Sequence, residues 1–246
     1  MDFLENGCIT RWLKRLESLD GNASITDSKV TIQKTGITKL SVDCIVNAAN
    51  SGLMEGGGVC GAIFREAGSY ELQKACDRFG GCKTGSAVIT PGFKLKAKYI
   101  IHAVGPRWNG GNQGEKDQLY SCYQASMRLA EEHDCHTIAF PVISSGIFGY
   151  PKKEAWQVAL QSVRDYQQMH SNYKLDVIFA VLSDDAFELG NSVLSELQYY
   201  GYKFTDRESL VNMIVDYICY YNTARLQRNL GILTPMEKHV QFYLAA

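Results

Sequence analysis

The stretch that decides the fold is DCIVNAANSGLMEGGGVCGAIFREAG, residues 43–68. It begins with an apolar run, passes through a polar turn and three consecutive glycines, and continues with apolar residues at helical spacing. This order predicts a buried strand, then a loop of bare backbone, then a helix. Glycines lose more conformational entropy on folding than other residues, so a ligand or another part of the chain is expected to approach the backbone here.

Elsewhere in the chain, apolar runs of the same kind alternate with helical patterns. Strands are expected at 29–33, 43–49, 86–90, 98–104, 136–145 and 175–183. Helices are expected near 58–78, 115–132, 152–170 and 185–199. The alternation predicts an α/β fold, a three-layer sandwich with a mixed, mostly parallel central sheet.

The two ends of the chain have different patterns from this middle part. Residues 1–24 carry apolar side chains at helical spacing and predict an amphipathic helical segment. The run QYYGYKF, 198–204, predicts a last strand, which places the α/β domain at 25–204. The sequence TDRE then has the form of a capping box, so 205–246 is predicted to be a helical C-terminal extension.

Composition excludes several classes of protein. The 246 residues are 46% hydrophobic and 21% charged, which is ordinary for a globular protein. The net charge of −1 gives no electrostatic reason to expect nucleic acid as a partner. No apolar window reaches the length of a membrane span, and the N-terminus lacks the apolar core of a signal peptide. We therefore expect a cytoplasmic protein that makes no membrane contact.

The eight cysteines include no C-x-x-C pair, so reduced thiols are expected. The cluster HDCH, 133–136, invites a zinc interpretation. It is too compressed for tetrahedral ligation, however, and a polar loop before a strand is the favoured interpretation. The sequence thus predicts no metal site and no redox cofactor.

A second glycine-bearing loop, SSGIFGY at 144–150, matches the first loop, EGGGVCG at 55–61, in its position between a strand and a helix. Free N–H groups and the helix dipole at such a junction favour an anion, and two junctions on one sheet edge can hold the two phosphates of a diphosphate. Neither loop has the glycine pattern of a dinucleotide-binding dehydrogenase or of a phosphate-loop NTPase.

Three motifs in this order resemble the macrodomain family: the quoted stretch, CKTGSAVITPGFKLKAKYIIHAVGP and TIAFPVISSGIFGYP. The similarity covers about 30–197. It is closest to the branch with bacterial O-acetyl-ADP-ribose deacetylases and mono-ADP-ribosyl hydrolases. The resemblance implies that ADP-ribose or O-acetyl-ADP-ribose lies across the sheet edge, with an ADP-ribosylated protein as a further possible partner.

The resemblance also assigns roles to single residues. Asn50 would hydrogen-bond the distal ribose hydroxyls, and Phe148 would pack against that ribose. At the adenine, the implied positions are Gly36 and Ile37, with Leu182 where an aromatic residue often covers the base. At the distal ribose and its phosphate, they are Gly57, Gly58 and Val59. At the diphosphate, they are Ser145, Gly146 and Ile147.

Cys60 and Glu55 depart from the family's pattern. Cys60 stands where related enzymes usually have an aspartate that positions or activates the attacking water. A helix N-terminus can make a thiol nucleophilic, but a neutral thiol that fills space is the other interpretation. Glu55 replaces the first glycine of the usual run, and it is either an alternative base or a solvent-facing loop residue.

Three hypotheses about function follow. The first is a hydrolase in which water, held between the distal ribose and a phosphate, attacks an ester or the anomeric carbon. The second is a reader module that binds ADP-ribose without turnover. Three departures from the family's pattern favour it: Cys60 for the aspartate, Phe148 for a tyrosine, and Gly36 for an aspartate that usually bonds the adenine amino group. The third is an adaptor that uses its tail, since 210–244 resembles the C-terminal end of integrase-type transposases. The apolar helical face in that tail is of a kind that more often docks on its own domain, and a dimer contact is a third possibility.

Overall fold

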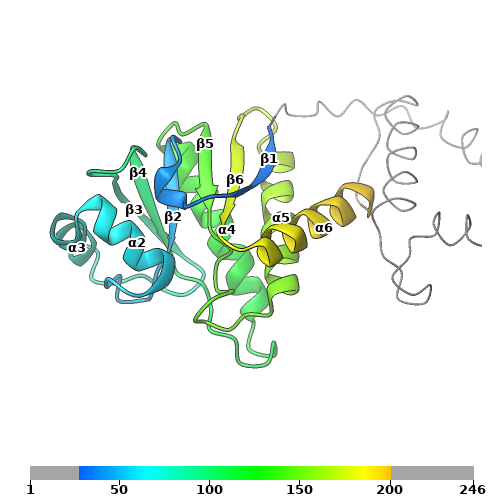
Figure 1. The fold of residues 1–246 in the computed structure, drawn as a ribbon, viewed down its shortest axis with the longest axis horizontal. Coiled ribbons are helices and arrows are strands. Elements are labelled where there is room, and N and C mark those ends of the chain that lie inside the picture. Colours follow the sequence, from blue (N-terminus) through cyan, green and yellow to red (C-terminus); the bar gives the residue numbers. More distant parts are fainter. Residues whose placement is uncertain (1–27, 201–246) are drawn as a thin grey trace, which may run out of the picture. The chain divides into compact units, whose positions relative to one another are not determined.

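The computed structural model describes residues 28–200, which form one sheet with helices on both faces (Figure 1). The strands are β1 (Val30–Lys34), β2 (Cys44–Ala48), β3 (Ala87–Pro91), β4 (Tyr99–Ala103), β5 (Thr137–Phe140) and β6 (Asp176–Val181). The helices are the short 3-10 turn η1 (Ile37–Lys39), then α2 (Gly58–Ala67), α3 (Ser69–Asp77), α4 (Glu115–Glu132), α5 (Lys152–Met169) and α6 (Asp184–Tyr200).

The six strands lie in the order β1-β6-β5-β2-β4-β3. Every neighbouring pair is parallel except β3 and β4, which run antiparallel at one edge. The predicted mixed, mostly parallel sheet is therefore confirmed. Because β2 and β5 are parallel neighbours, the segments that follow them leave the sheet at the same edge, which is where open α/β sheets bind ligands.

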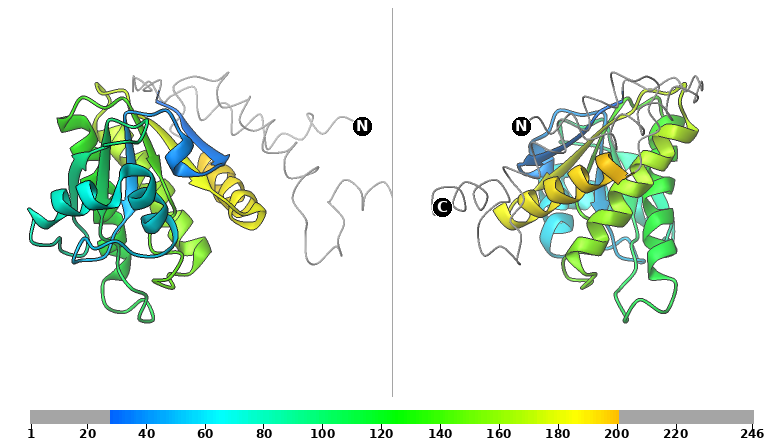
Figure 2. Two further views of the ribbon diagram at one scale, coloured as in Figure 1. Left: turned by 60° about the vertical axis from the view of Figure 1, so that its left-hand side comes forward. Right: turned by 90° about the vertical axis from the view of Figure 1, so that its right-hand side faces the viewer.

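Alternate side chains of the strands fill two separate cores, one on each face. On β2, Ile45 packs with residues of α2 and α3, whereas Cys44 and Val46 point to the opposite face and pack with α4 and α5. The views in Figure 2 show these two helical layers on either side of the sheet. Helix α6 lies on the α5 side, where Val193 joins the same core. This arrangement confirms the three-layer sandwich.

Asp43, the first residue of the quoted stretch, ties together the starts of three strands. Its carboxylate accepts hydrogen bonds from the backbone N–H groups of His136 and Thr137, both at 3.1 Å, and from the Thr137 hydroxyl at 2.8 Å. Lys98, just before β4, lies 2.7 Å from its other oxygen. The end of the sheet opposite to the glycine loops is thus fixed by one side chain.

Two expectations differ from the structure. The helix expected at 58–78 is divided into α2 and α3 by Gly68, whose φ of 102° is outside the helical range. The strand expected at 198–204 is wrong where it can be compared, because 198–200 continue α6. Apolar side chains at helical spacing, including Val193 and Leu197, pack against the core and carry the helix on.

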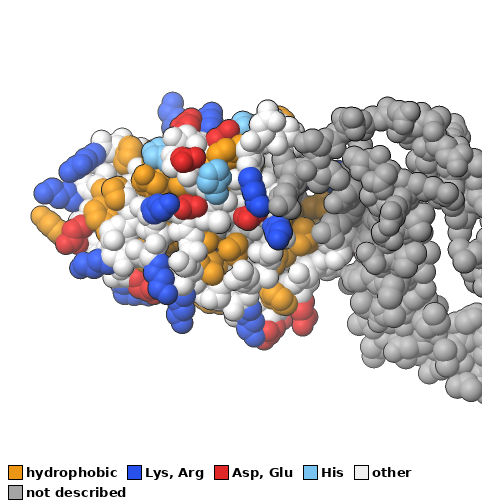
Figure 3. Space-filling model, turned by 90° about the horizontal axis from the view of Figure 1, so that it is seen from above, with side chains coloured by type: hydrophobic (Ala, Val, Ile, Leu, Met, Phe, Trp, Pro, Cys, Tyr) orange, Lys and Arg blue, Asp and Glu red, His pale blue; other side chains and the backbone are white. Residues whose placement is uncertain are grey.

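Residues Ser24–Leu197 form one compact unit. The predicted segment 1–24, the remainder of the strand expected at 198–204 and the predicted extension 205–246 lie outside the described residues. On the face shown in Figure 3, acidic, basic and hydrophobic side chains are interspersed. Among residues 28–200, no helix combines the length and the hydropathy that a membrane crossing requires.

Candidate functional site

The two glycine loops meet at the carboxyl edge of the sheet. Gly57 is the N-cap of α2, and a Cβ atom built on it would lie 3.5 Å from Cδ1 of Ile147 in the second loop. Gly58, the first residue of α2, has a φ of 61°, in the left-handed region that glycine adopts without strain. The first N–H groups of a helix have no partner within it, so the first loop presents backbone donors close to the second loop.

Asn50 lies two residues after the end of β2 and binds the loop at Met54. Its Nδ2 donates to the Met54 carbonyl at 2.7 Å, and its Oδ1 accepts from the Met54 N–H at 3.1 Å. An amide side chain has two N–H donors and two acceptor lone pairs, so one of each remains for a ligand. Its role toward a ribose stays a prediction. The bonds to Met54 show the alternative role of an asparagine at a strand end, which is to satisfy local backbone groups.

Glu55 lies between the loop and α3. Its Oε1 accepts a hydrogen bond from the Ser69 hydroxyl at 3.2 Å, and its backbone N–H donates to Oε1 of Gln73 at 3.0 Å. The side chain is thus neither free in solvent nor bonded to the second loop in the described part of the chain. Its prediction as a base remains untested.

Cys60 lies in the first turn of α2 and is 5% exposed. Asn47 Nδ2 approaches its sulfur at 3.6 Å, and the thiol lies 3.8 Å from the Met54 carbonyl oxygen. Burial raises the pKa of the Cys60 thiol, although the Asn47 hydrogen bond acts in the opposite direction. At neutral pH this position therefore carries an uncharged thiol where related enzymes usually carry a carboxylate.

A buried polar chain continues from Cys60 beneath the loop. Asn47 Nδ2 lies 3.1 Å from Nδ1 of His102, and Nε2 of His102 lies 3.0 Å from the Thr90 hydroxyl. Asn47 and His102 are fully buried, and burial lowers the pKa of His102 to about 4. The imidazole is therefore neutral at neutral pH. In the described part of the chain, Asn47 Oδ1 has no hydrogen-bond partner.

The second loop begins with Ser144, which the sequence interpretation passed over. Ser144 has a φ of 65°, an uncommon conformation for a residue other than glycine, and its buried hydroxyl has no hydrogen-bond partner among residues 28–200. A Cβ atom at Gly105 would lie 2.3 Å from that hydroxyl, so this turn requires a glycine after β4. Strain of this kind is concentrated at binding sites.

The rest of the second loop is closed by its own hydrogen bonds. The Ser145 hydroxyl donates to the Val142 carbonyl at 2.8 Å, and the Gly149 N–H donates to the Gly146 carbonyl at 2.9 Å. Gly146 is exposed, and Ile147 is 76% exposed although it is apolar. The predicted diphosphate positions are thus accessible at the edge of the sheet.

Arg107 is a second residue that the sequence interpretation missed. Its guanidinium carbon lies 4.5 Å from the centre of the Phe148 ring, a cation–π distance. The neighbouring Trp108 N–H donates to the Phe148 carbonyl at 2.9 Å, which joins the segment after β4 to the second loop. The signal that could have found it is one basic residue directly after the HAVGP strand end.

The residues expected at the adenine lie on the adjoining strands. Gly36 is the N-cap of η1 after β1, Ile37 is buried as the first residue of η1, and Leu182 follows β6 and is 78% exposed. β1 pairs with β6, with Lys34 opposite Val181, so Gly36 and Leu182 leave the sheet at the same edge. The structure therefore brings the predicted positions to one edge, although no described contact tests their binding roles.

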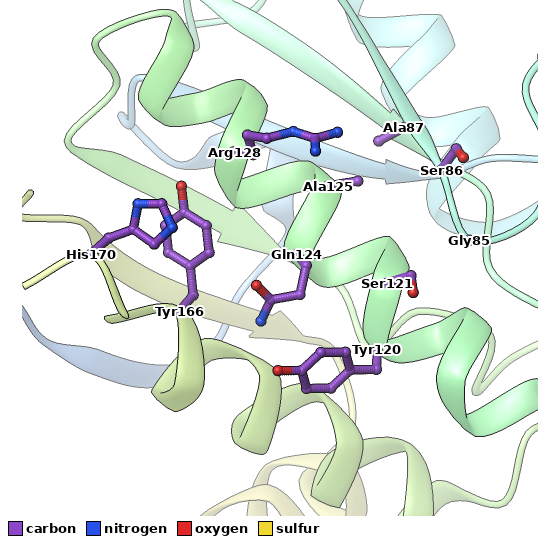
Figure 4. Close-up of a pocket in the computed structure, with 10 residues that line it drawn as sticks. All are labelled: Gly85, Ser86, Ala87, Tyr120, Ser121, Gln124, Ala125, Arg128, Tyr166 and His170. Atoms are coloured by element: carbon purple, nitrogen blue, oxygen red, sulfur yellow. The ribbon is translucent and has the colours of Figure 1, made fainter. Parts of the chain in front are cut away.

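A hollow of about 570 Å³ lies elsewhere, over the outer face of α4 (Figure 4). Its wall includes Tyr120 and Arg128 of α4 and His170 after α5, and it contains no predicted site residue. Several of its polar groups are already bonded: the Tyr120 hydroxyl donates to Asp165 at 3.0 Å, and His170 pairs with Glu131 at 2.8 Å. This hollow is separate from the glycine loops.

The HDCH segment forms a polar turn before β5. His133 Nδ1 lies 2.9 Å from the Leu129 carbonyl, His136 Nδ1 lies 2.9 Å from the Lys174 carbonyl, and Cys135 is buried. Within residues 28–200, no group of three or more histidine, cysteine or acidic side chains is arranged to hold a metal ion.

Comparisons with known proteins agree with this geometry. The chain matches the Macro domain family over residues 46–159, and the integrase core domain family over residues 193–241. The second match confirms the resemblance expected for the tail, most of which lies outside the described part. Macro domain-containing protein CT2219 from Chlorobaculum tepidum is 49% identical over 162 residues, which cover 66% of this chain and 93% of that protein.

ADP-ribose glycohydrolase MACROD2 from Xenopus laevis is 47% identical over 170 residues, 68% of this chain but 40% of that protein. Among solved structures, the Oceanobacillus iheyensis macrodomain with ADP has a TM-score of 0.66 at 35% identity, covering 73% of this chain and 96% of that one. The Trypanosoma brucei macrodomain in complex with ADP has a TM-score of 0.63 at 30% identity, covering 76% and 85%. With the sheet order, the two loops and this similarity in agreement, the chain belongs to the macrodomain family.

Proposed function

We propose that this chain binds ADP-ribose at the carboxyl edge of its sheet and hydrolyses O-acetyl-ADP-ribose or mono-ADP-ribosyl ester links. The observation that carries the proposal is the meeting of the two loops, 3.5 Å apart between a Cβ position at Gly57 and Ile147. Two glycine-bearing loops with backbone donors on one edge suit a diphosphate. The similarity to an ADP-ribose glycohydrolase and to macrodomains with ADP supports the same ligand.

In this proposal, catalysis depends on orientation. Water held between the distal ribose and a phosphate attacks the ester carbonyl carbon or the anomeric carbon, and its proton passes to a phosphate oxygen of the ligand. Attack at the carbonyl carbon breaks the acyl C–O bond, and the proton passes on to the ribose oxygen that leaves, which gives ADP-ribose and a carboxylate. Attack at the anomeric carbon breaks the bond from that carbon to the ester oxygen, which gives ADP-ribose and a carboxylate, and the proton passes to solvent. Asn50 fixes the ribose with its remaining donor and acceptor, and the loops fix the phosphates. Residues of the protein need not supply a base, which is consistent with the uncharged thiol of Cys60.

The test pairs calorimetry with a de-ADP-ribosylation assay. Wild-type protein should bind ADP-ribose and release it from an ester-linked substrate faster than an Asn50→Ala variant, because that change removes the group that orients the ribose. Binding without turnover above the Asn50→Ala level would refute the hydrolase. Absence of ADP-ribose binding at millimolar ligand would refute the ligand as well.

A reader module without turnover is the second candidate, and Cys60 favours it. The thiol lies beside Asn47 and the Met54 carbonyl, and it lacks the charge with which an aspartate orients or activates water. A Cys60→Asp variant separates the two functions. A gain of turnover from zero would identify the natural protein as a reader, whereas measurable wild-type turnover identifies a hydrolase.

A further inference from the structure

A glutamine of α3 holds the first glycine loop from the side opposite to Asn50. Gln73 Oε1 accepts the Glu55 N–H at 3.0 Å, and Gln73 Nε2 donates to the Leu53 carbonyl at 3.3 Å. Asn50 binds both backbone groups of Met54, which lies between these two residues. The segment Leu53–Glu55 is therefore bonded along both of its edges by side-chain amides, much as a strand is bonded by its two neighbours.

The orientation of the Gln73 amide follows from its third partner. Nε2 also donates to Oδ1 of Asp77, one turn along α3, at 2.8 Å. A carboxylate only accepts hydrogen bonds, so the nitrogen must face Asp77 and the oxygen must face the Glu55 N–H. On the loop side, Nε2 lies 3.3 Å from the Leu53 carbonyl oxygen and 3.6 Å from the Met54 sulfur. With one hydrogen toward Asp77 and the other toward the loop, the side chain has one favoured arrangement.

The segment between the two amides needs such support. Leu53 has a φ of 55°, and its side chain is 1% exposed. A left-handed conformation at a residue other than glycine costs about 1–2 kcal/mol and persists only where the surroundings fix it. Once Glu55 is fixed, the next two residues are Gly56 and Gly57, and α2 begins directly after them.

We infer that Gln73 is a positioning residue of the ligand site, and that its hydrogen bonds to Leu53 and Glu55 set where the glycine loop stands. Its side chain binds loop backbone, and its effect on a ligand passes through Gly56 and Gly57. The inference rests on the proposed function, because ADP-ribose is the ligand whose distal ribose and phosphate that loop would meet.

The experiment uses the full chain with a Gln73→Met variant, which keeps the side-chain length and removes every hydrogen bond of the Gln73 amide. Gln157→Met is the matched control, since Gln157 is exposed on α5, on the other face of the sheet. Calorimetry measures the Kd for ADP-ribose and for adenosine monophosphate, which lacks the distal ribose. Amide hydrogen exchange follows the loop without ligand.

Gln73→Met should raise the Kd for ADP-ribose about tenfold and the Kd for adenosine monophosphate less than twofold, so that the ratio of the two changes. Exchange should quicken at the amides of Met54 and Glu55, and Gln157→Met should behave as wild type. If the ratio of the two Kd values stays as in wild type, whether neither Kd changes or both rise together, the inference is overturned. The proposal that the wild-type protein binds ADP-ribose would still stand. If wild-type protein binds no ADP-ribose, the proposed function fails first and the positioning role falls with it.

Discussion

Replacing Gly61 by alanine should separate the stability of α2 from the geometry of the site. Gly61 is buried in α2, and a Cβ atom there would lie 2.4 Å from the carbonyl oxygen of Gly56 and 3.3 Å from Nη1 of Arg65. A real Cβ atom essentially never comes closer than 3.0 Å. Because the opposing atom belongs to the backbone, the glycine loop must retreat by about 0.6 Å or more.

Two effects of this change on stability oppose each other. Alanine is favoured over glycine within a helix by about 1 kcal/mol, while overpacking costs about 1–3 kcal/mol. The free energy of unfolding should therefore fall by no more than about 2 kcal/mol, and the protein should remain folded. The site is more sensitive, since displacement by about 1 Å can cost about 100-fold in function. We expect Gly61→Ala to raise the Kd for ADP-ribose about 10- to 100-fold.

Urea unfolding and calorimetry on the same preparations give the two quantities. Gly190→Ala is the matched control, because a Cβ atom in α6 would meet Trp156 at 2.6 Å and Ile32 at 2.9 Å, in the core on the opposite face from the glycine loop. It should lose a similar amount of stability and keep its affinity. Wild-type affinity in Gly61→Ala, or an equal loss of affinity in both variants, would refute the argument.

Three further outcomes are expected. Burial lowers the pKa of His102 to about 4, so the unfolded chain binds the proton first as the pH falls. Urea titrations should show the free energy of unfolding falling by up to about 3 kcal/mol between pH 6.5 and 4. The His102→Asn variant should show a smaller loss. Among the described residues, no atom from elsewhere in the chain lies within 4 Å of a Cβ built on Gly146, so Gly146→Ala should keep the wild-type urea midpoint. Calorimetry should show ADP-ribose binding about tenfold weaker in this variant. Wild-type affinity would argue against ligand contact at Gly146. Removing the cation beside Phe148 with Arg107→Ala should weaken ADP-ribose binding about two- to fivefold at low salt and less at high salt, and a loss independent of salt would contradict an electrostatic role.

The fold could be predicted because buried parallel strands carry continuous apolar runs that differ from helical spacing. The expected strands at 43–49 and 98–104 contain β2 and β4 as observed. The run at 198–204 misled because aromatic residues favour strands when considered alone. Upstream, Val193 and Leu197 bury their side chains at helical spacing, and this tertiary packing continues the helix.

The meeting of the two glycine loops at one edge of the sheet could be predicted from the sequence. Gly57 and Ile147 are far apart in sequence, but equivalent positions after parallel strands implied that they meet. Gln73 and Arg107 escaped prediction for a common reason. Each acts on a loop of another element, through backbone groups or a ring, and such contacts leave no spacing pattern in the sequence.

The choice between a hydrolase and a reader depends mainly on the chemistry of Cys60. Its raised pKa keeps the thiol protonated at neutral pH, and the thiol faces Asn47 and the Met54 carbonyl. Glu55, the single carboxylate in either loop sequence, is bonded to Ser69. In the proposed mechanism, a water at the distal ribose transfers its proton to the ligand's own phosphate rather than to either of these side chains. Turnover would then depend on how firmly the remaining donor and acceptor of Asn50 hold the ribose. The Met54 contacts that occupy half of the Asn50 amide also keep that amide in place.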